Sequence, residues 1–256
     1  MPLAITQSVG FMATPDSQLT PAADPNLWLW ATSDYGTTYD PVTFKMQSDN
    51  DWLDRSGNGR HLSSTLERYT KYVTAPAAPM PSGKPVIRFD PTDPGGPPVP
   101  TQFTTSSGGL ANLGTAHTVY MLMRVPTWEW PKYFFDGGAA ANTSGISMQP
   151  AVTGDVSLSA PSLAPTLTAM PIAEWIILTA VFNTINSTLQ VNNGTKATGN
   201  PGPNTPNWAW VGGITTVGVY HAKFDLGAII ISNSANDEAT QAIHKNYLAT
   251  YGGITI

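Results

Sequence analysis

The chain has 256 residues, a length that one all-β sandwich can fill, so we expect a single large domain. Only 11% of the residues are charged, while 23 Gly and 23 Pro punctuate the chain, which favours short strands and turns over long helices. A net charge of −5, with 12 scattered Lys and Arg, supplies no basic stripe and argues against nucleic acid as a partner. Cysteine is absent, which excludes disulfides and thiolate metal sites.

Residues 1–24 are predicted to form an N-terminal arm, followed by one domain over residues 25–256. The arm lacks the basic start and continuous apolar run of a secretory signal, and no stretch of the chain reaches the roughly 20 apolar residues of a membrane helix. We therefore expect no signal peptide and no membrane insertion. Two roles stay open for the arm: it lies on its own domain, or it docks on a neighbouring subunit.

Short apolar runs bounded by Gly, Pro, Asn and Asp predict the strands of a sandwich. Residues 119–123 and 175–182 are apolar at nearly every position, which predicts central strands that are covered on both faces. The dipeptide Asn193-Gly194 follows an alternating run and predicts a two-residue hairpin turn. The predicted strands are 27–31, 86–89, 118–125, 133–135, 174–182, 188–191 and 227–231.

One helix is predicted near the C-terminus. Ser234 is the expected N-cap, with Asp237 three residues further on, and Gly252 and Gly253 follow the last turn. A spacing of four predicts the apolar stripe that would face the sheet: Ala239, Ile243, Tyr247 and Tyr251.

Six segments of the chain, taken in order, form a recognisable series: Asn26-Leu-Trp-Leu-Trp-Ala31, Trp52-Leu-Asp-Arg-Ser-Gly-Asn-Gly-Arg60, Gly83-Lys-Pro-Val-Ile-Arg-Phe-Asp90, Asn192-Asn-Gly194, Tyr247-Leu-Ala249 and Tyr251-Gly252. Together they resemble the laminin-G-like domains, concanavalin A-like lectin jelly rolls that are common in bacterial and bacteriophage proteins. The resemblance implies an all-β, two-sheet antiparallel jelly-roll β-sandwich with one C-terminal α-helix. It also implies a link to carbohydrate binding or adhesion and, in phages, to capsid decoration, tail or fibre proteins. The chain departs from the family at Trp30, Pro91 and Thr250.

A cluster of hard oxygen ligands makes calcium a candidate, although no cofactor is clearly indicated. The candidate ligands are Asp49, Asp51, Asp54 and Asn58. Their spacing is not that of an EF-hand. The alternative is a tight turn in which Asp54 and Asn58 bond to backbone groups while Gly57 and Gly59 take positive φ.

The carboxylates and histidines do not form a recognisable catalytic set. A glycosidase needs two carboxylates that flank the scissile bond. The four glutamates, however, are each more than 40 residues apart: Glu67, Glu129, Glu174 and Glu238. The four histidines lack metal-binding spacing. We therefore expect a protein that is not an enzyme.

Aromatic residues in two loops are the candidate carbohydrate-binding residues. Alternate tryptophans can stack on sugar rings while Glu129 and Lys132 bond to hydroxyls. Packing at the rim of the sandwich and burial against a neighbouring subunit are the alternatives. The candidates are Trp128, Glu129, Trp130, Lys132, Tyr133, Trp208 and Trp210.

These observations lead to three hypotheses of function. The first is a bacteriophage virion structural protein, a capsid-decoration or tail-associated module, assembled in the host cytoplasm with other virion proteins and symmetric copies of itself. The alternative is a carbohydrate-binding or adhesion module that recognises host glycans. The third is a polysaccharide-acting enzyme.

Overall fold

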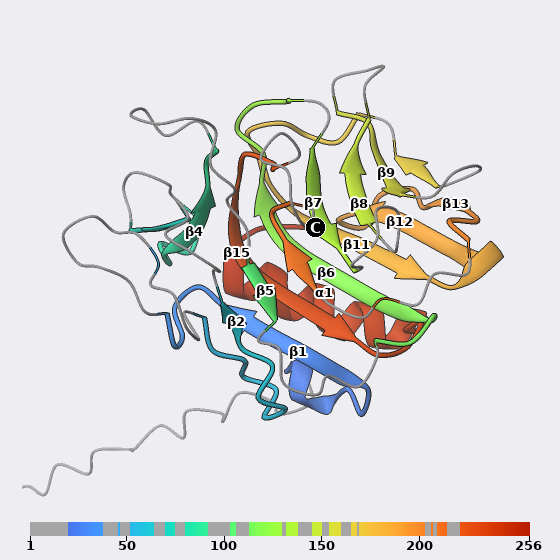
Figure 1. The fold of residues 1–256 in the computed structure, drawn as a ribbon, viewed down its shortest axis with the longest axis horizontal. Coiled ribbons are helices and arrows are strands. Elements are labelled where there is room, and N and C mark those ends of the chain that lie inside the picture. The colour runs from blue at the N-terminus through green and yellow to red at the C-terminus, as the bar shows by residue number, and fades with distance from the viewer. Residues whose placement is uncertain are drawn as a thin grey trace, which may run out of the picture.

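Two antiparallel sheets form the body of the protein, as the computed structural model shows (Figure 1). Sheet A has eight strands in the order β13-β12-β11-β6-β15-β4-β3, with β1 also beside β15, and sheet B has seven in the order β10-β9-β8-β7-β14-β5-β2. The structure describes residues 20–37, 46, 52–63, 70–74, 80–91, 103–105, 113–129, 132–137, 145–149, 154–159, 165–167, 169–202, 206, 209–213 and 221–256.

The strands of the two sheets have the following residue bounds. Sheet A contains β1 (Leu27–Thr32), β3 (Lys71–Val73), β4 (Val86–Phe89), β6 (His117–Arg124), β11 (Trp175–Phe182), β12 (Ser187–Val191), β13 (Ala197–Gly199) and β15 (Phe224–Ser232). Sheet B contains β2 (Leu62–Ser63), β5 (Phe103–Thr105), β7 (Tyr133–Asp136), β8 (Gly145–Met148), β9 (Val156–Ser159), β10 (Thr166–Leu167) and β14 (Trp210–Val211). One α-helix, α1 (Glu238–Gly252), and the 3-10 turns η2 (Pro21–Ala23) and η3 (Thr184–Asn186) complete the described elements. The predicted fold class is confirmed.

The two strands predicted to be central lie in the middle of sheet A. β11 pairs with β6 along its full length, and β6 pairs with β15 on its other side. Their side chains alternate between two apolar layers. Val119 and Met121 join the core between the sheets, whereas Tyr120 and Leu122 join a second core on the outer face of sheet A. The continuous apolar sequence reflects burial on both faces.

Helix α1 covers that outer face, lying alongside β6 and β15 (Figure 1). It comes so close at Gly252 that a Cβ there would lie 2.9 Å from Leu122. The helix begins later than predicted. Asp237 is the N-cap, because its carboxylate accepts a hydrogen bond from the Thr240 amide at 2.8 Å, while the Ser234 hydroxyl donates to Asn236 outside the helix.

The apolar stripe predicted for α1 is also wrong in part. Ala239 is exposed and Ile243 and Tyr247 are only half-buried, although Tyr251 is buried as predicted. The physical reason is that the first half of the helix covers polar partners, including Asp24 and Gln190. The buried face of the helix therefore holds Gln241, His244, Lys245, Leu248, Ala249, Tyr251 and Gly252.

The turn after β12 differs from the predicted Asn193-Gly194 hairpin. The turn is centred on Asn192 and Asn193, and Gly194 N–H donates to the carbonyl of Val191 at 2.9 Å. Asn192 takes the positive φ, at 50°. The shift occurs because Asn192 extends the ladder with β11: its amide donates to the Ile177 carbonyl and its side chain accepts from the Ile177 amide, both at 2.8 Å.

Candidate functional site

The outer face of sheet B is built from polar and aromatic side chains. Successive residues of a strand point to opposite faces, and residues directly paired across strands share a face. On β8 and β9 the apolar residues Ile146, Val156 and Leu158 belong to the core between the sheets. The intervening Ser147 and Ser157 therefore point outward.

One row of outward residues crosses four strands of sheet B. Tyr133 of β7 pairs with Ser147, Ser147 pairs with Ser157, and Ser157 pairs with Thr166 of β10. We call these four residues the outer row. Every member carries a hydroxyl group, and Tyr133 adds an aromatic ring.

A second row of outward residues crosses the neighbouring part of the sheet. Ser63 of β2 pairs with Thr104, Thr104 pairs with Trp210, and Trp210 pairs with Asp136 of β7. We call these four the inner row. The Trp210 indole N–H is buried and has no hydrogen-bond partner in the described part of the chain. An acceptor atom placed next to this N–H could therefore form a hydrogen bond with it.

The middle of the outer row lies beneath Gln149. The Gln149 amide nitrogen lies 3.4 Å from the Ser147 hydroxyl and also donates to the Ser157 hydroxyl. Ser147 and Ser157 are buried, Gln149 and Tyr133 are half-buried, and Thr166 is exposed. The groups of this row that reach the surface are therefore the Tyr133 ring, the Gln149 amide and the Thr166 hydroxyl.

The structure places the predicted aromatic residues in different surroundings. Tyr133 and Trp210 share the outer face of sheet B, on the adjacent strands β7 and β14. Trp128 is half-buried and packs against the core between the sheets, in agreement with rim packing. Glu129 and Lys132 are half-buried on the segment that leads to β7. A binding role for these three residues stays a prediction, and Trp130 and Trp208 lie outside the described residues.

The Trp52–Arg60 segment is held by Asp54 in the way the tight-turn alternative predicts. The Asp54 carboxylate accepts from the amides of Trp30, Ser56 and Arg60 at 3.0, 2.8 and 3.1 Å. Asn58 donates to the carbonyl of Leu27 at 2.9 Å. Gly57 and Gly59 have φ of 84° and 68°, and Trp52 is fully buried.

The calcium ligands proposed from the sequence are only partly described. Asp49 and Asp51 lie outside the described residues, and Asp54 already accepts several hydrogen bonds. Within the ranges that the structure describes, no three His, Asp or Glu side chains gather in a way that could hold a metal ion. Nor does that part of the chain contain a helix long and apolar enough to cross a membrane.

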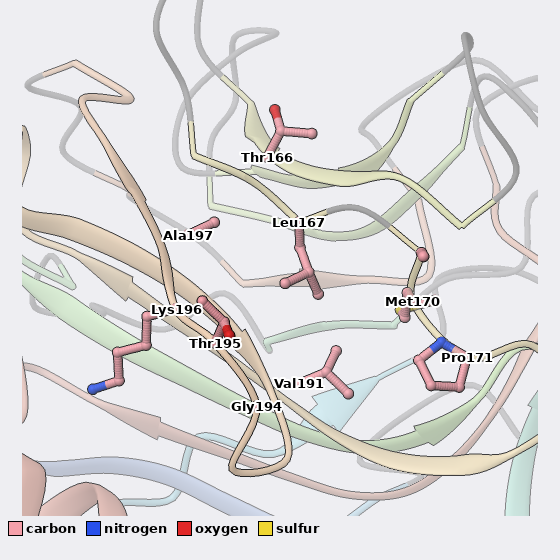
Figure 2. Close-up of a pocket in the computed structure, with 10 residues that line it drawn as sticks. Thr166, Leu167, Met170, Pro171, Val191, Gly194, Thr195, Lys196 and Ala197 are labelled. Atoms are coloured by element: carbon pink, nitrogen blue, oxygen red, sulfur yellow. The ribbon is translucent and has the colours of Figure 1, made fainter.

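A pocket of about 470 Å³ opens at the edge of the sandwich, between the outermost described strands of the two sheets. We call it the edge pocket. Figure 2 shows Leu167 of β10 and Val191 of β12 pointing toward one another across it, with Met170 and Pro171 to one side. The remaining lining residues are Thr166, Ala169, Gly194, Thr195, Lys196 and Ala197.

Backbone strain gathers around the edge pocket. Ala169, which lines it, has a φ of 58°, and Ala173 and Asn192 on the segments beside it have φ of 63° and 50°. A positive φ at alanine costs roughly 1 kcal/mol or more and persists only where the surroundings impose it. Such strain is typical of binding loops.

Compared by sequence, the chain matches no family model and no curated protein. Compared by structure, it has the fold of lectin-like β-sandwich domains. It superposes on the binding domain of Paraclostridial Mosquitocidal Protein 1 with a TM-score of 0.55 at 11% identity, over 91% of this chain and 53% of that one. The botulinum neurotoxin serotype C1 binding domain gives 0.58 at 10% identity, over 90% and 53%. Trypanosoma rangeli sialidase gives 0.56 at 10% identity, over 90% and 34%.

The chain thus spans about half the length of these toxin domains and a third of the sialidase. At such identities the similarity establishes the fold.

Sequence reasoning found Tyr133 but not the other three members of the outer row, although a signal for two of them was present. The segments Ile146-Ser-Met148 and Val156-Ser-Leu158 alternate apolar and polar residues with the period of a strand that buries one face. The edge pocket has no such signal, because its two walls come from segments that meet only in the folded protein.

Proposed function

We propose that the protein is a carbohydrate-binding module that binds a glycan on the outer face of sheet B. The observation that carries the proposal is that the half-buried Tyr133, Trp210 and Gln149 and the exposed Thr166 share one face of a sheet. The other hydroxyls of the two rows and the Asp136 carboxylate are buried beneath that surface. Hydroxyl and amide groups both donate to and accept from sugar hydroxyls. The Tyr133 ring offers an apolar surface to the C–H face of a sugar.

The structural neighbours support this class of ligand. One neighbour of the same fold is a botulinum neurotoxin binding domain in complex with SialylT, and cell entry of the type C neurotoxin depends on interaction with two ganglioside molecules. The Trypanosoma rangeli sialidase was solved with the inhibitor DANA.

The proposal is one of binding without catalysis. Glu238 forms an ion pair with Lys196 in the first turn of α1, and Glu174 is exposed at the entrance of β11. Neither of these glutamates belongs to the outer row, where the glycan is proposed to lie.

A glycan array with purified protein tests the proposal. We expect binding to a defined set of glycans, with Tyr133→Ala weakening it about tenfold because a contact of roughly 1.4 kcal/mol is lost. Tyr35→Ala is the matched control, since it removes a tyrosine that is 44% exposed, follows β1 of sheet A and belongs to neither row. Equal binding by both variants, or no binding by the parent protein to any glycan, would contradict the proposal.

A second proposal, that the protein is a virion structural component, rests on the sequence resemblance to phage domains. It is compatible with the first, because a protein on a virion surface that binds host glycans does both. Mass spectrometry of purified particles tests it. The protein should be present in many copies per particle, and its absence from particles of a phage that encodes it would refute the proposal.

A further inference from the structure

We infer that the edge pocket binds the terminal sugar of a neutral glycan whose chain lies along the outer row. The inference rests on the proposed function, and it adds where the glycan chain ends and that its terminal sugar is neutral.

The outer row leads directly to the pocket. Its last member, Thr166, lies on β10, the outermost described strand of sheet B, and also lines the pocket. Neighbouring strands are about 4.8 Å apart, so the four positions from Tyr133 to Thr166 span roughly 14 Å. A chain that follows this row therefore reaches the pocket at the edge of the sheet.

Thr166 and Leu167 join the two sites. Figure 2 shows Leu167 directed toward Val191, into the pocket, whereas the Thr166 side chain points away from Val191, toward the outer face. This is the alternation expected of successive strand residues. A ligand that contacts the Thr166 hydroxyl thus has the pocket one residue away.

The lining of the pocket suits a sugar ring. Apolar side chains, including those of Leu167, Val191 and Met170, provide surfaces for C–H groups, while Thr195 and the backbone of the turn provide polar groups for hydroxyls. The volume, about 470 Å³, lies in the range of small-molecule sites.

The charges around the pocket favour a neutral ligand. Among the described residues that line it, Lys196 alone is charged, and Figure 2 shows its side chain extending away from Leu167 and Val191. Its ammonium group forms an ion pair with Glu238 and lies 3.3 Å from the Gln241 side-chain oxygen. The carboxylate of an acidic sugar in the pocket would therefore have no positively charged side chain facing it among the described lining residues.

An extended peptide fits the pocket less well. Strand addition depends on a row of backbone hydrogen bonds along an edge. The two edges here are short, with two residues in β10 and three in β13. Such edges supply few backbone bonds, so the binding must come from the pocket itself.

A substitution that fills the pocket tests the inference. Thr195→Trp places a large ring at an exposed lining position. Thr198→Trp is the matched control, because Thr198 is equally exposed on the adjacent strand β13 and does not line the pocket. On a glycan array of neutral and acidic oligosaccharides attached through their reducing ends, we expect Thr195→Trp to lose at least about tenfold in affinity. Thr198→Trp should bind like the parent.

A second measurement does not depend on variants. Amide NMR spectra of the parent protein, titrated with neutral monosaccharides at millimolar concentration, should show shifts at Leu167, Gly194 and Thr195. The same titration with sugar acids should leave these amides unchanged.

The outcomes separate the inference from the proposed function. If Thr195→Trp binds like the parent while Tyr133→Ala does not, the pocket is not part of the site, and glycan binding on sheet B stands. Amide shifts at the pocket with sugar acids alone would overturn the neutral assignment. If the parent binds no glycan in either experiment, the proposed function falls and the inference falls with it.

Discussion

His117, the first residue of β6, makes the protein sensitive to acid. Its side chain is fully buried, its ring stacks on Phe182 with centroids 4.4 Å apart, and its Nδ1 lies 3.2 Å from the Gly114 carbonyl oxygen. Burial disfavours the charged imidazolium and lowers the pKa of His117 to about 3. Between pH 6.5 and 3 the unfolded chain therefore binds a proton that the folded chain does not, and the free energy of unfolding falls as the pH falls.

The variant His117→Phe should remove this part of the pH dependence. Phenylalanine keeps the ring stacking and cannot be protonated. From pH 7 to pH 4.5 the parent should lose about 2 to 3 kcal/mol through His117, and the variant should lose that much less. Urea unfolding at the two pH values measures the difference. Parallel losses in the two proteins would show that a different group is responsible.

At the level of single residues, sequence reasoning succeeds where a role is local. The turn at Asp54 could be predicted because the Ser56 and Arg60 amides that donate to it lie within a short segment. The Trp30 amide, which also donates to Asp54, is 24 residues away and was not predicted as a partner. Gln149 could not be assigned in the same way. Its partners Ser147 and Ser157 come together only when β8 and β9 pair.

At the level of elements, strands that bury both faces are the predictable ones. β4 begins and ends as predicted, and β6 and β11 differ by one residue at their ends. The strands that the sequence did not reveal are short, with two to four residues each, so their apolar signal rests on only one or two residues. They are β2, β3, β5, β8, β9, β10, β13 and β14.

Helix α1 shows why an apolar stripe can mislead. When a helix packs on a purely apolar sheet, its buried face consists of aliphatic and aromatic residues, and these can be recognised in the sequence. Here the first half of the helix buries His244 and Lys245, which bond to Asp24 and to Asn193 at 2.9 and 2.8 Å. The buried polar partners are distant in sequence, so the register of the helix depends on contacts that the pattern alone does not contain.

At the level of the whole molecule, the two outer faces differ. α1 closes the outer face of sheet A over an apolar core, whereas the outer face of sheet B carries the hydroxyl rows. The segment at the start of the described chain contributes to the closed side. Asp24 follows η2 and is buried beneath α1, where it accepts from His244 at 2.9 Å, from Asn236 at 3.3 Å and from Ser232.

This arrangement matters for any test of the predicted arm over residues 1–24. Deleting the arm through Asp24 would remove a carboxylate from the sandwich itself and leave His244 buried without its acidic partner. A buried donor that is left without its acceptor costs about 1 to 3 kcal/mol. A deletion of residues 1–19 keeps this contact and separates a docking role of the arm from the stability of the domain.

A pair of truncated chains tests the contribution of Asp24 to the stability of the whole domain. A chain that begins at Thr20 should have the same free energy of unfolding in urea as the full chain. A chain that begins at Asn26 should have a free energy of unfolding that is lower by about 1 to 3 kcal/mol. Burial opposes ionisation of Asp24, but hydrogen bonds from His244, Ser232 and Asn26 outweigh it and lower its pKa to about 2. Its stabilisation is therefore present above pH 3.8 and is lost as the pH falls toward 2, so the two truncated chains should become more alike in stability in acid.

A difference in stability that stays constant down to pH 2 would show that the loss comes from the packing of η2 and not from the Asp24 carboxylate. The variant Asp24→Ala, made in the chain that begins at Thr20, distinguishes these two causes at pH 7.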